Sequence, residues 1–544
     1  MAKNIFSLRP LQCLALFLVF FAFSCVQISY ILNGLAWLDY GLWLLVPASV
    51  LFMVDSFILV GTRPCSYGLM LVVMLAASLF CIYYKTLFIF GIMDDNYHNA
   101  KIIAASMDNA FFSKWRYLLP AEDMRFYLPD FLESLWGLFW RWTRSDLVII
   151  VVQTFPLLLL WRMLTNYFER QGIQRAAALL ATVVVLSLQP FWSQIGSTYI
   201  DSTAGVVGAV TLLLMDEALS FHGQRPLQLL AGLAFAAGIC LIIKASVLLV
   251  GITGLVTAFW FAFRQPVRRG SLLVVGVALP ALMYCLYHQA GVWILKGDLS
   301  YPLNIHQADQ GFDGYYYYYY YSSPLNEWIR NYAGDFKPLY ILAGWVSDCN
   351  GCKTITPDTW SKGNGLVFAY FVIPVLSCAL FWGIRNFAGF FSGSGSFWKS
   401  PRVLLPGLML FQYWVFNGSP GERFMLAYSA LILAWCLACL WRYLEQRESR
   451  GFRIAAGIMN VIILVLAGVS YWHALPGVIP VRDNDISMLQ AQHRVFPDHI
   501  DTMKVRTDVL ESLSGHLLAG LEWRGSDATD KGNKNSLECQ GASF

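Results

Sequence analysis

The sequence predicts an all-α, polytopic membrane protein with about 13 spanning helices. Hydrophobic residues make up 57% of the 544 residues, and charged residues only 13%, against roughly 25% in soluble domains. The apolar residues also gather in runs of about 17 to 25, the length that crosses the hydrocarbon core of a bilayer as a helix. Composition and run length together therefore predict the fold class.

The predicted spans share a high apolar content and are bounded by polar or charged residues. They lie at 11–32, 41–60, 67–91, 145–163, 175–193, 199–219, 226–243, 247–263, 271–294, 364–384, 402–416, 424–442 and 453–473. The first run follows Lys3 and Arg9 as a signal peptide would, but its length of roughly 22 residues favours a span that is retained. The seventh and eighth runs could form one long helix, or a hairpin that turns at Lys244, Ala245 and Ser246.

The distribution of basic residues favours the hairpin and sets the orientation. With a cytoplasmic N-terminus and a hairpin, the Arg264–Arg269 and Arg442–Arg453 clusters face the cytoplasm, as the positive-inside rule requires. Residues 1–473 then form one transmembrane domain with outer loops at 92–144 and 295–363. The tail, 474–544, lies outside the cytoplasm and is partly disordered, because its end is polar and Gly-rich.

An acidic pair opens the first outer loop. Asp94 and Asp95 directly follow the third predicted span. One carboxylate can act as general base on a hydroxyl acceptor, and the pair, Asp95 in particular, can hold a divalent cation such as Mg²⁺ or Mn²⁺ beside a phosphate. The alternative is that the two acids only mark the end of the span.

Two amphipathic stretches follow the acids in the same loop. Asn99–Phe112 and Phe131–Trp142 have helical patterns, and the second carries Glu133 and Arg141 on its polar side. Amphipathic helices of this kind lie flat in the membrane interface. The loop therefore predicts a site that works at the depth of the lipid headgroups.

Further short motifs follow the acids in a fixed order along the chain. They are Tyr97-His98, Tyr199-Ile-Asp201 at the outer start of a span, the Gly-rich run Gly232–Lys244, and Glu422-Arg423 at the outer mouth of a late span. In order and placement they resemble the GT-C superfamily of membrane glycosyltransferases. The chain departs from that family in two ways. Ile243 replaces a usual Thr, and the acidic loop follows the third span, whereas members usually place it after the first.

The resemblance implies that a sugar is transferred from a polyprenyl-linked phosphate or diphosphate on the periplasmic side of a bacterial inner membrane. The roles it implies are catalysis by Asp94 and Asp95, donor-phosphate binding by Lys244, Arg423 and His98, and substrate binding by Tyr97, Asp201 and Glu422. Lys244 could instead extend its amine to the outer surface. Asp201 could cap a helix, and His98 could be structural.

The acceptor is a cell-envelope molecule whose class stays open: a glycolipid such as lipid A, a polysaccharide, or an exported protein such as a pilin. In the second outer loop, Tyr315–Tyr321 could stack on sugar rings or anchor the interface, and Cys349 and Cys352 could form a disulfide. The net charge of +4, without a basic cluster, gives no sign of nucleic-acid binding.

Two other functions compete with sugar transfer. A surface-polysaccharide polymerase or ligase would depend on basic residues of the second outer loop, such as Arg330 or His306. A lipid-linked sugar flippase or transporter would depend on charged residues within the bilayer. Asp55 is the main residue of that kind, and Lys244 would be a second if the hairpin were absent.

Overall fold

The computed structural model describes residues 131–143, 147–193, 200–221, 226–264, 268–297, 371–372, 401–415, 425–445 and 450–474, with the isolated residues 44 and 76. Within these ranges all regular structure is helical. The elements are α6 (Phe131–Thr143), α7 (Leu147–Arg170), α8 (Arg175–Leu186), α9 (Gln189–Ser193), α10 (Asp201–Ser220), α11 (Leu227–Ile243), η4 (Ala245–Val247), α12 (Leu248–Phe263), α13 (Arg268–Lys296), α19 (Pro401–Val415), α20 (Leu426–Glu445) and α21 (Arg450–Ala474).

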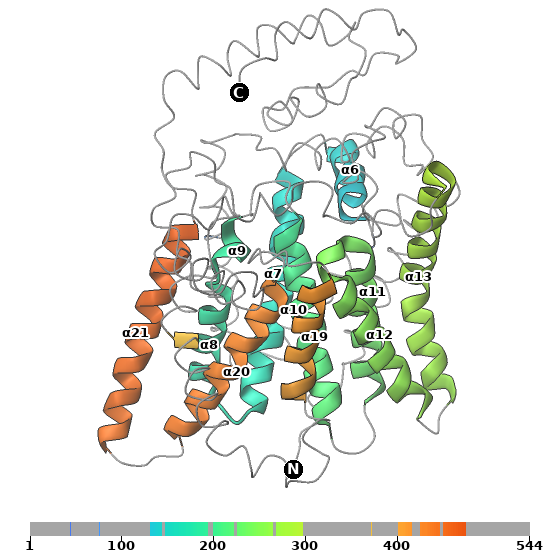
Figure 1. Ribbon diagram of the computed structural model, residues 1–544. Coiled ribbons are helices and arrows are strands. Elements are labelled where there is room, and N and C mark those ends of the chain that lie inside the picture. The colour runs from blue at the N-terminus through green and yellow to red at the C-terminus, as the bar shows by residue number, and fades with distance from the viewer. Residues whose placement is uncertain are drawn as a thin grey trace, which may run out of the picture.

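The long helices run side by side in one bundle around α10 (Figure 1). Helix α10 packs against α7, α11, α12 and α20, and α13 and α21 lie on opposite flanks in this view. We call the end of the bundle where α10 begins the upper end, and the end where α10 finishes the lower end. Helix α6 lies above the upper end, near α11 (Figure 1).

Two of the described helices, Asp201–Ser220 and Ser271–Ile294, are long and apolar enough to cross a membrane. The first is mostly buried within the bundle, whereas the second exposes large apolar side chains, among them Leu272, Leu286 and Ile294. Exposed apolar surface costs about 25 cal/mol per Å² in water, a cost that lipid removes. Length and exposure together favour a membrane protein.

Most of the predicted spans in the described part coincide with helices, but the span predicted at 175–193 is wrong. The chain breaks at Ser187 and Leu188 between α8 and α9. Pro190 has no N–H to donate to the carbonyl of Leu186, and the indole of Trp192 donates to that carbonyl instead. A proline and a tertiary hydrogen bond therefore end the helix early.

The hairpin prediction is confirmed. Helix α11 ends at Ile243, a short 3-10 turn covers Ala245–Val247, and α12 starts at Leu248. The two helices pack closely because glycine lies at the contact: a Cβ on Gly251 would come within 2.8 Å of the carbonyl oxygen of Ala237. Small residues allow such close approach between membrane helices.

Several predictions fall outside the described residues. Apart from residues 44, 76, 371 and 372, these are the spans at 11–32, 41–60, 67–91 and 364–384. The helix at 99–112 and the loop features at Tyr315–Tyr321, Cys349 and Cys352 also lie outside, as do Asp55, His306, Arg330 and the tail from 475. They remain predictions.

Candidate functional site

The upper end of the bundle contains a buried ion pair between Lys244 and Asp201. The Lys244 Nζ contacts Asp201 Oδ1, and the two side chains are 10% and 0% exposed respectively. Lys244 lies in the turn between α11 and α12, and Asp201 is the first residue of α10. The fold thus brings together two of the residues predicted for the site from segments far apart in the sequence.

Lys244 is buried in the turn between two short helices. Helices α11 and α12 have 17 and 16 residues, or about 25 Å at 1.5 Å per residue, whereas the hydrocarbon core is about 30 Å thick. Each helix of the hairpin is therefore shorter than the hydrocarbon core is thick. The alternative in which Lys244 extends its amine to the surface is wrong, because the amine points to a buried carboxylate.

The backbone that carries Asp201 is held on two sides. The Ser202 hydroxyl donates a 2.9 Å hydrogen bond to the carbonyl of Phe191 on α9. One turn later Gly205 packs so closely on Leu426 of α20 that a Cβ would meet its Cδ2 at 2.6 Å. The N-cap residue of α10 is Ile200, so the alternative in which Asp201 caps the helix is also wrong.

The ion pair is held in surroundings where charge is costly. Several kcal/mol of desolvation per ion are offset only while each charge has its partner, and removing one partner costs about 3–5 kcal/mol. The α10 N-terminus adds a favourable dipole for the Asp201 carboxylate. A neutral, buried pair of this kind can either hold the fold or exchange one partner for a ligand of like charge.

Helix α6 covers this end of the bundle. Leu132 and Trp136 pack against Ile200, the residue before Asp201, and the Phe131 ring meets the Tyr284 ring at 5.8 Å. The helix predicted at 131–142 is therefore confirmed. Glu133, predicted on the polar side of this helix, is fully buried where α6 packs on its neighbours.

The sequence reasoning also missed His288, a buried residue of α13. His288 is 3% exposed, and its ring stacks on that of Tyr284, one turn earlier, with centroids 6.1 Å apart. A histidine within an otherwise apolar run was the available signal, since imidazole in a span needs polar partners. Glu133 gave the same kind of signal in a stretch rich in Trp and Leu.

The other predicted site residues, Asp94, Asp95, Tyr97, His98, Glu422 and Arg423, lie outside the described residues. Arg423 precedes Met425 and Leu426 by two and three positions, and both of those residues are buried at the upper end. Among the described residues, no group of three His, Cys, Asp or Glu side chains could hold a metal ion. The predicted metal ligand Asp95 lies outside the described residues, so the prediction of a metal site there is not tested.

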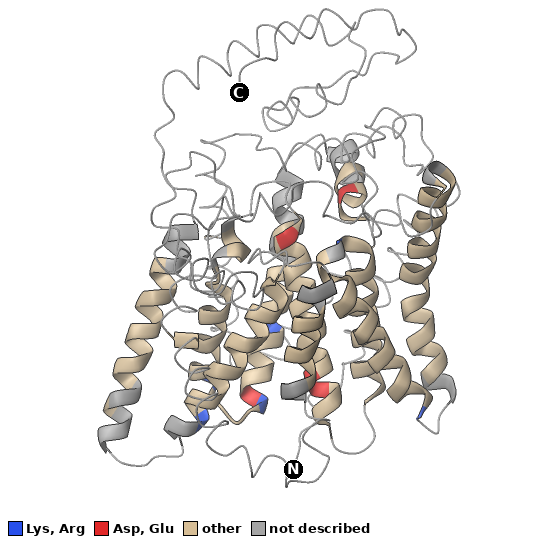
Figure 2. Cartoon of the chain, in the orientation of Figure 1, with Lys and Arg blue, Asp and Glu red and all other residues tan. Residues whose placement is uncertain are grey.

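The lower end carries a different set of polar contacts. Arg170 pairs with Glu217, Arg442 donates to the carbonyl of Gln171 at 2.8 Å, and the Trp435 indole donates to Asp216 at 3.3 Å. In Figure 2 the acidic residues that are coloured lie toward the two ends of the bundle. The contacts join α7, α10 and α20 at their lower ends.

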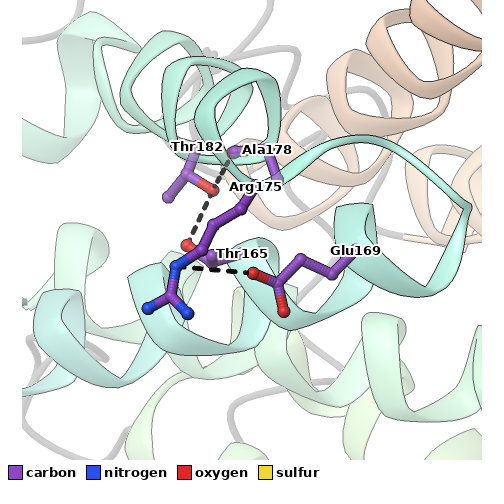
Figure 3. A network of polar contacts seen from close by, with 5 residues as sticks. All are labelled: Thr165, Glu169, Arg175, Ala178 and Thr182. Carbon is purple, nitrogen blue, oxygen red and sulfur yellow. Dashed lines mark hydrogen bonds and ion pairs between the residues drawn. The ribbon is translucent and has the colours of Figure 1, made fainter. Parts of the chain in front are cut away.

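Helices α7 and α8 are joined at the lower end by a small network (Figure 3). Thr165 and Thr182 share a hydrogen bond of 3.1 Å, and Arg175 lies 3.8 Å from Glu169. Nearby, burial lowers the pKa of Arg170 to about 9, so the guanidinium stays positively charged at neutral pH. These contacts join α7 to its neighbour α8.

No protein-family model, curated protein or solved structure matches this chain.

Proposed function

We propose that the chain is a glycosyltransferase that moves a sugar from a polyprenyl-phosphate or polyprenyl-diphosphate donor to a cell-envelope acceptor. The buried Lys244–Asp201 pair carries the proposal. It includes a buried cation at the upper end, where α6 packs on Ile200, the residue before Asp201. In the predicted topology α6 belongs to the loop that begins with Asp94 and Asp95. A cation at that depth suits the phosphate of a lipid-linked sugar, whose prenyl chain stays in the bilayer.

In the proposed reaction an acceptor hydroxyl attacks the anomeric carbon of the donor sugar. The bond from that carbon to the phosphate oxygen breaks, and its electron pair leaves with the polyprenyl phosphate. Asp94 or Asp95 accepts the hydroxyl proton. Lys244, Arg423 and His98 stabilise the negative charge on the leaving phosphate, the kind of stabilisation that often supplies the largest catalytic effect.

The remaining predicted residues bind substrate or metal, or orient a residue that binds the donor. Tyr97 and Glu422 contact the sugar or acceptor, and Asp201 orients Lys244. Asp95 holds Mg²⁺ or Mn²⁺ if the reaction uses a divalent cation. The donor head reaches these groups from the periplasmic side of a bacterial inner membrane. This orientation places the lower end, with Arg170, Arg175 and Arg442, at the cytoplasmic face, in keeping with the positive-inside rule.

Transfer activity in proteoliposomes tests the proposal. Labelled polyprenyl-phosphate sugars are supplied with an envelope extract as acceptor. The wild type is compared with Asp94→Asn, Asp95→Asn and Lys244→Met, and Glu217→Gln at the lower end serves as the matched control. Loss of general-base catalysis typically costs about 10²–10⁴-fold. Label that stays on the carrier with every sugar offered, despite folded protein, contradicts the proposal.

A transporter of lipid-linked sugars is the second candidate, and one observation favours it. Charged and titratable groups buried within spans often line transport pathways, and Lys244, Asp201 and His288 are buried in this bundle. Proteoliposomes with labelled carrier confined to one leaflet separate the two functions. Movement of label to the other leaflet without any transfer to acceptor favours the transporter.

A further inference from the structure

The two members of the upper ion pair differ in how freely they can move. Asp201 is part of α10, whose first turn is held by the Ser202 hydrogen bond to Phe191 and by the contact of Gly205 with Leu426. Lys244 has an extended backbone (φ −160°, ψ 145°) between two helices, and its charge sits on a flexible four-carbon chain. Any rearrangement of the pair therefore moves the lysine rather than the aspartate.

The two members also differ in access. The Lys244 side chain keeps 10% of its surface exposed, whereas the Asp201 side chain has none. A ligand that reaches the pair therefore meets the Lys244 side chain before that of Asp201. Because the ammonium is a compact charge with three N–H donors, it can bind an incoming oxyanion while it loosens its contact with Asp201.

The charges of the pair sum to zero, and this limits what a phosphate gains by binding. A phosphate oxygen and the Asp201 carboxylate compete for the same donors, and the two anions repel each other. Removing the carboxylate charge would leave Lys244 without this counter-charge in a poorly hydrated site, where charge-assisted hydrogen bonds to a ligand are strong.

We propose that Asp201 is a built-in counter-anion that a phosphate ligand displaces from Lys244, so that the carboxylate weakens and thereby sets the affinity of the site for phosphate. The inference rests on the proposed donor site in so far as the natural ligand is a lipid-linked phosphate. The chemistry needs only a phosphate anion, whether it is carried on a prenyl chain or free in solution.

The test measures the binding of farnesyl phosphate, inorganic phosphate and farnesol to the purified full chain in detergent. Asp201→Asn should bind farnesyl phosphate at least about tenfold more tightly than the wild type, the scale expected for removing a close competing charge. Lys244→Met should lose phosphate binding, and farnesol binding should not change. Glu217→Gln, which removes a paired carboxylate at the other end of the same helix, should bind as the wild type does.

The two phosphates separate the possible sources of the ligand. Tighter binding of both by Asp201→Asn supports the proposal for a phosphate anion in general, and tighter binding of farnesyl phosphate alone supports it for a lipid-linked one. Equal or weaker binding of both by folded Asp201→Asn overturns it and makes the pair purely structural. If Asp201→Asn does not fold, Asp201→Ser replaces it. Failure of both to fold with phosphate present also overturns the proposal, because a bound phosphate should replace the missing carboxylate.

The result of this binding test can be distinguished from the result of the transfer test of the proposed function. Sugar transfer by the wild type, without tighter binding by Asp201→Asn, overturns only the counter-anion. Tighter binding by the variant, with no transfer of any sugar by the wild type, supports the counter-anion and contradicts the glycosyltransferase.

Discussion

The two ends of α10 each carry a carboxylate that pairs with a cation, and the two ends are built differently. At the upper end Asp201 pairs with Lys244, which lies in a turn between helices. At the lower end Glu217 pairs with Arg170, and its neighbour Asp216 accepts a hydrogen bond from Trp435. The lower cation and the indole both come from regular helices that pack on α10.

The difference teaches where ligand chemistry can take place in this bundle. At the lower end several polar contacts join the helices. Their side chains belong to helices that are themselves held in place by packing. At the upper end one ion pair is made by Lys244, which lies outside any helix, and α6 packs nearby on Ile200. A partner on a turn can change its contact without disrupting a helix, which suits the upper pair to exchange with a ligand.

The largest expected effect is on activity. Lys244→Met should lower the rate of sugar transfer by about 10²–10³-fold, since removing one group that stabilises developing negative charge costs this much in other enzymes. Arg170→Met should leave the transfer rate per folded protein near that of the wild type. Initial rates in proteoliposomes, normalised to protein that elutes as a single folded species, measure both. Equal losses of transfer rate in the two variants would contradict the proposed difference between the two ends of α10.

The next effect is on stability. Asp201→Asn should lower the free energy of unfolding by about 3–5 kcal/mol, because it leaves Lys244 buried without this charged partner. Glu217→Gln should cost about 1 kcal/mol or less, because that pair is partly exposed and water screens it. Unfolding in mixed detergent micelles gives both values. The double variant Lys244→Met/Asp201→Leu should recover much of the loss, and failure to do so would mean that the pair has further structural partners.

A smaller effect tests the contact that places the start of α20 beside Asp201. Gly205→Ala should cost about 1–3 kcal/mol, as overpacking does in other cores, because its Cβ would lie within 3 Å of three Leu426 side-chain atoms. Gly232→Ala, with nothing within 4 Å of its Cβ, should be neutral or stabilising, since alanine favours helix. The same unfolding assay applies, and a reversed order of the two variants would contradict the packing described for α10 and α20.

The smallest effect lies in the shared contacts of the lower end. Trp435→Phe should cost about 0.5–1.5 kcal/mol, the worth of one hydrogen bond, because it removes the indole donor to Asp216. Trp441→Phe is the control on the same helix, since the buried indole N–H of Trp441 has no acceptor within the described part of the chain. Equal changes in melting temperature would show that the Asp216 contact contributes nothing.

Several local features of the fold could be predicted from the sequence. The run predicted at 226–243 became α11 at Leu227–Ile243, and the predicted turn at Lys244 is present. The helix predicted at Phe131–Trp142 became α6. These features depend on the local spacing of apolar residues, which a sequence shows directly. The roles of Asp94, Asp95, Tyr97, His98, Glu422 and Arg423 rest on resemblance, and they stay predictions.

The failures have a common physical cause. The break at Ser187 depends on Pro190 and on an indole that caps a freed carbonyl. The burial of Glu133 depends on the helices against which α6 packs, and that of His288 on the ring of Tyr284 and the helices around it. Each of these depends on a contact in space, and apolar periodicity along the chain carries no information about it.

The sequence by itself determined that the chain is apolar, that its described part is helical, and where most of the described helices begin and end. Hydrogen bonds within a helix and the length of an apolar run are local properties. Only the tertiary structure decided that Lys244 meets Asp201. That contact depends on how α10 packs between α11 and α20, where Gly205 lets Leu426 approach closely. Whether a lysine reaches the surface or pairs inside is set by such packing, because burial makes an unpaired charge costly.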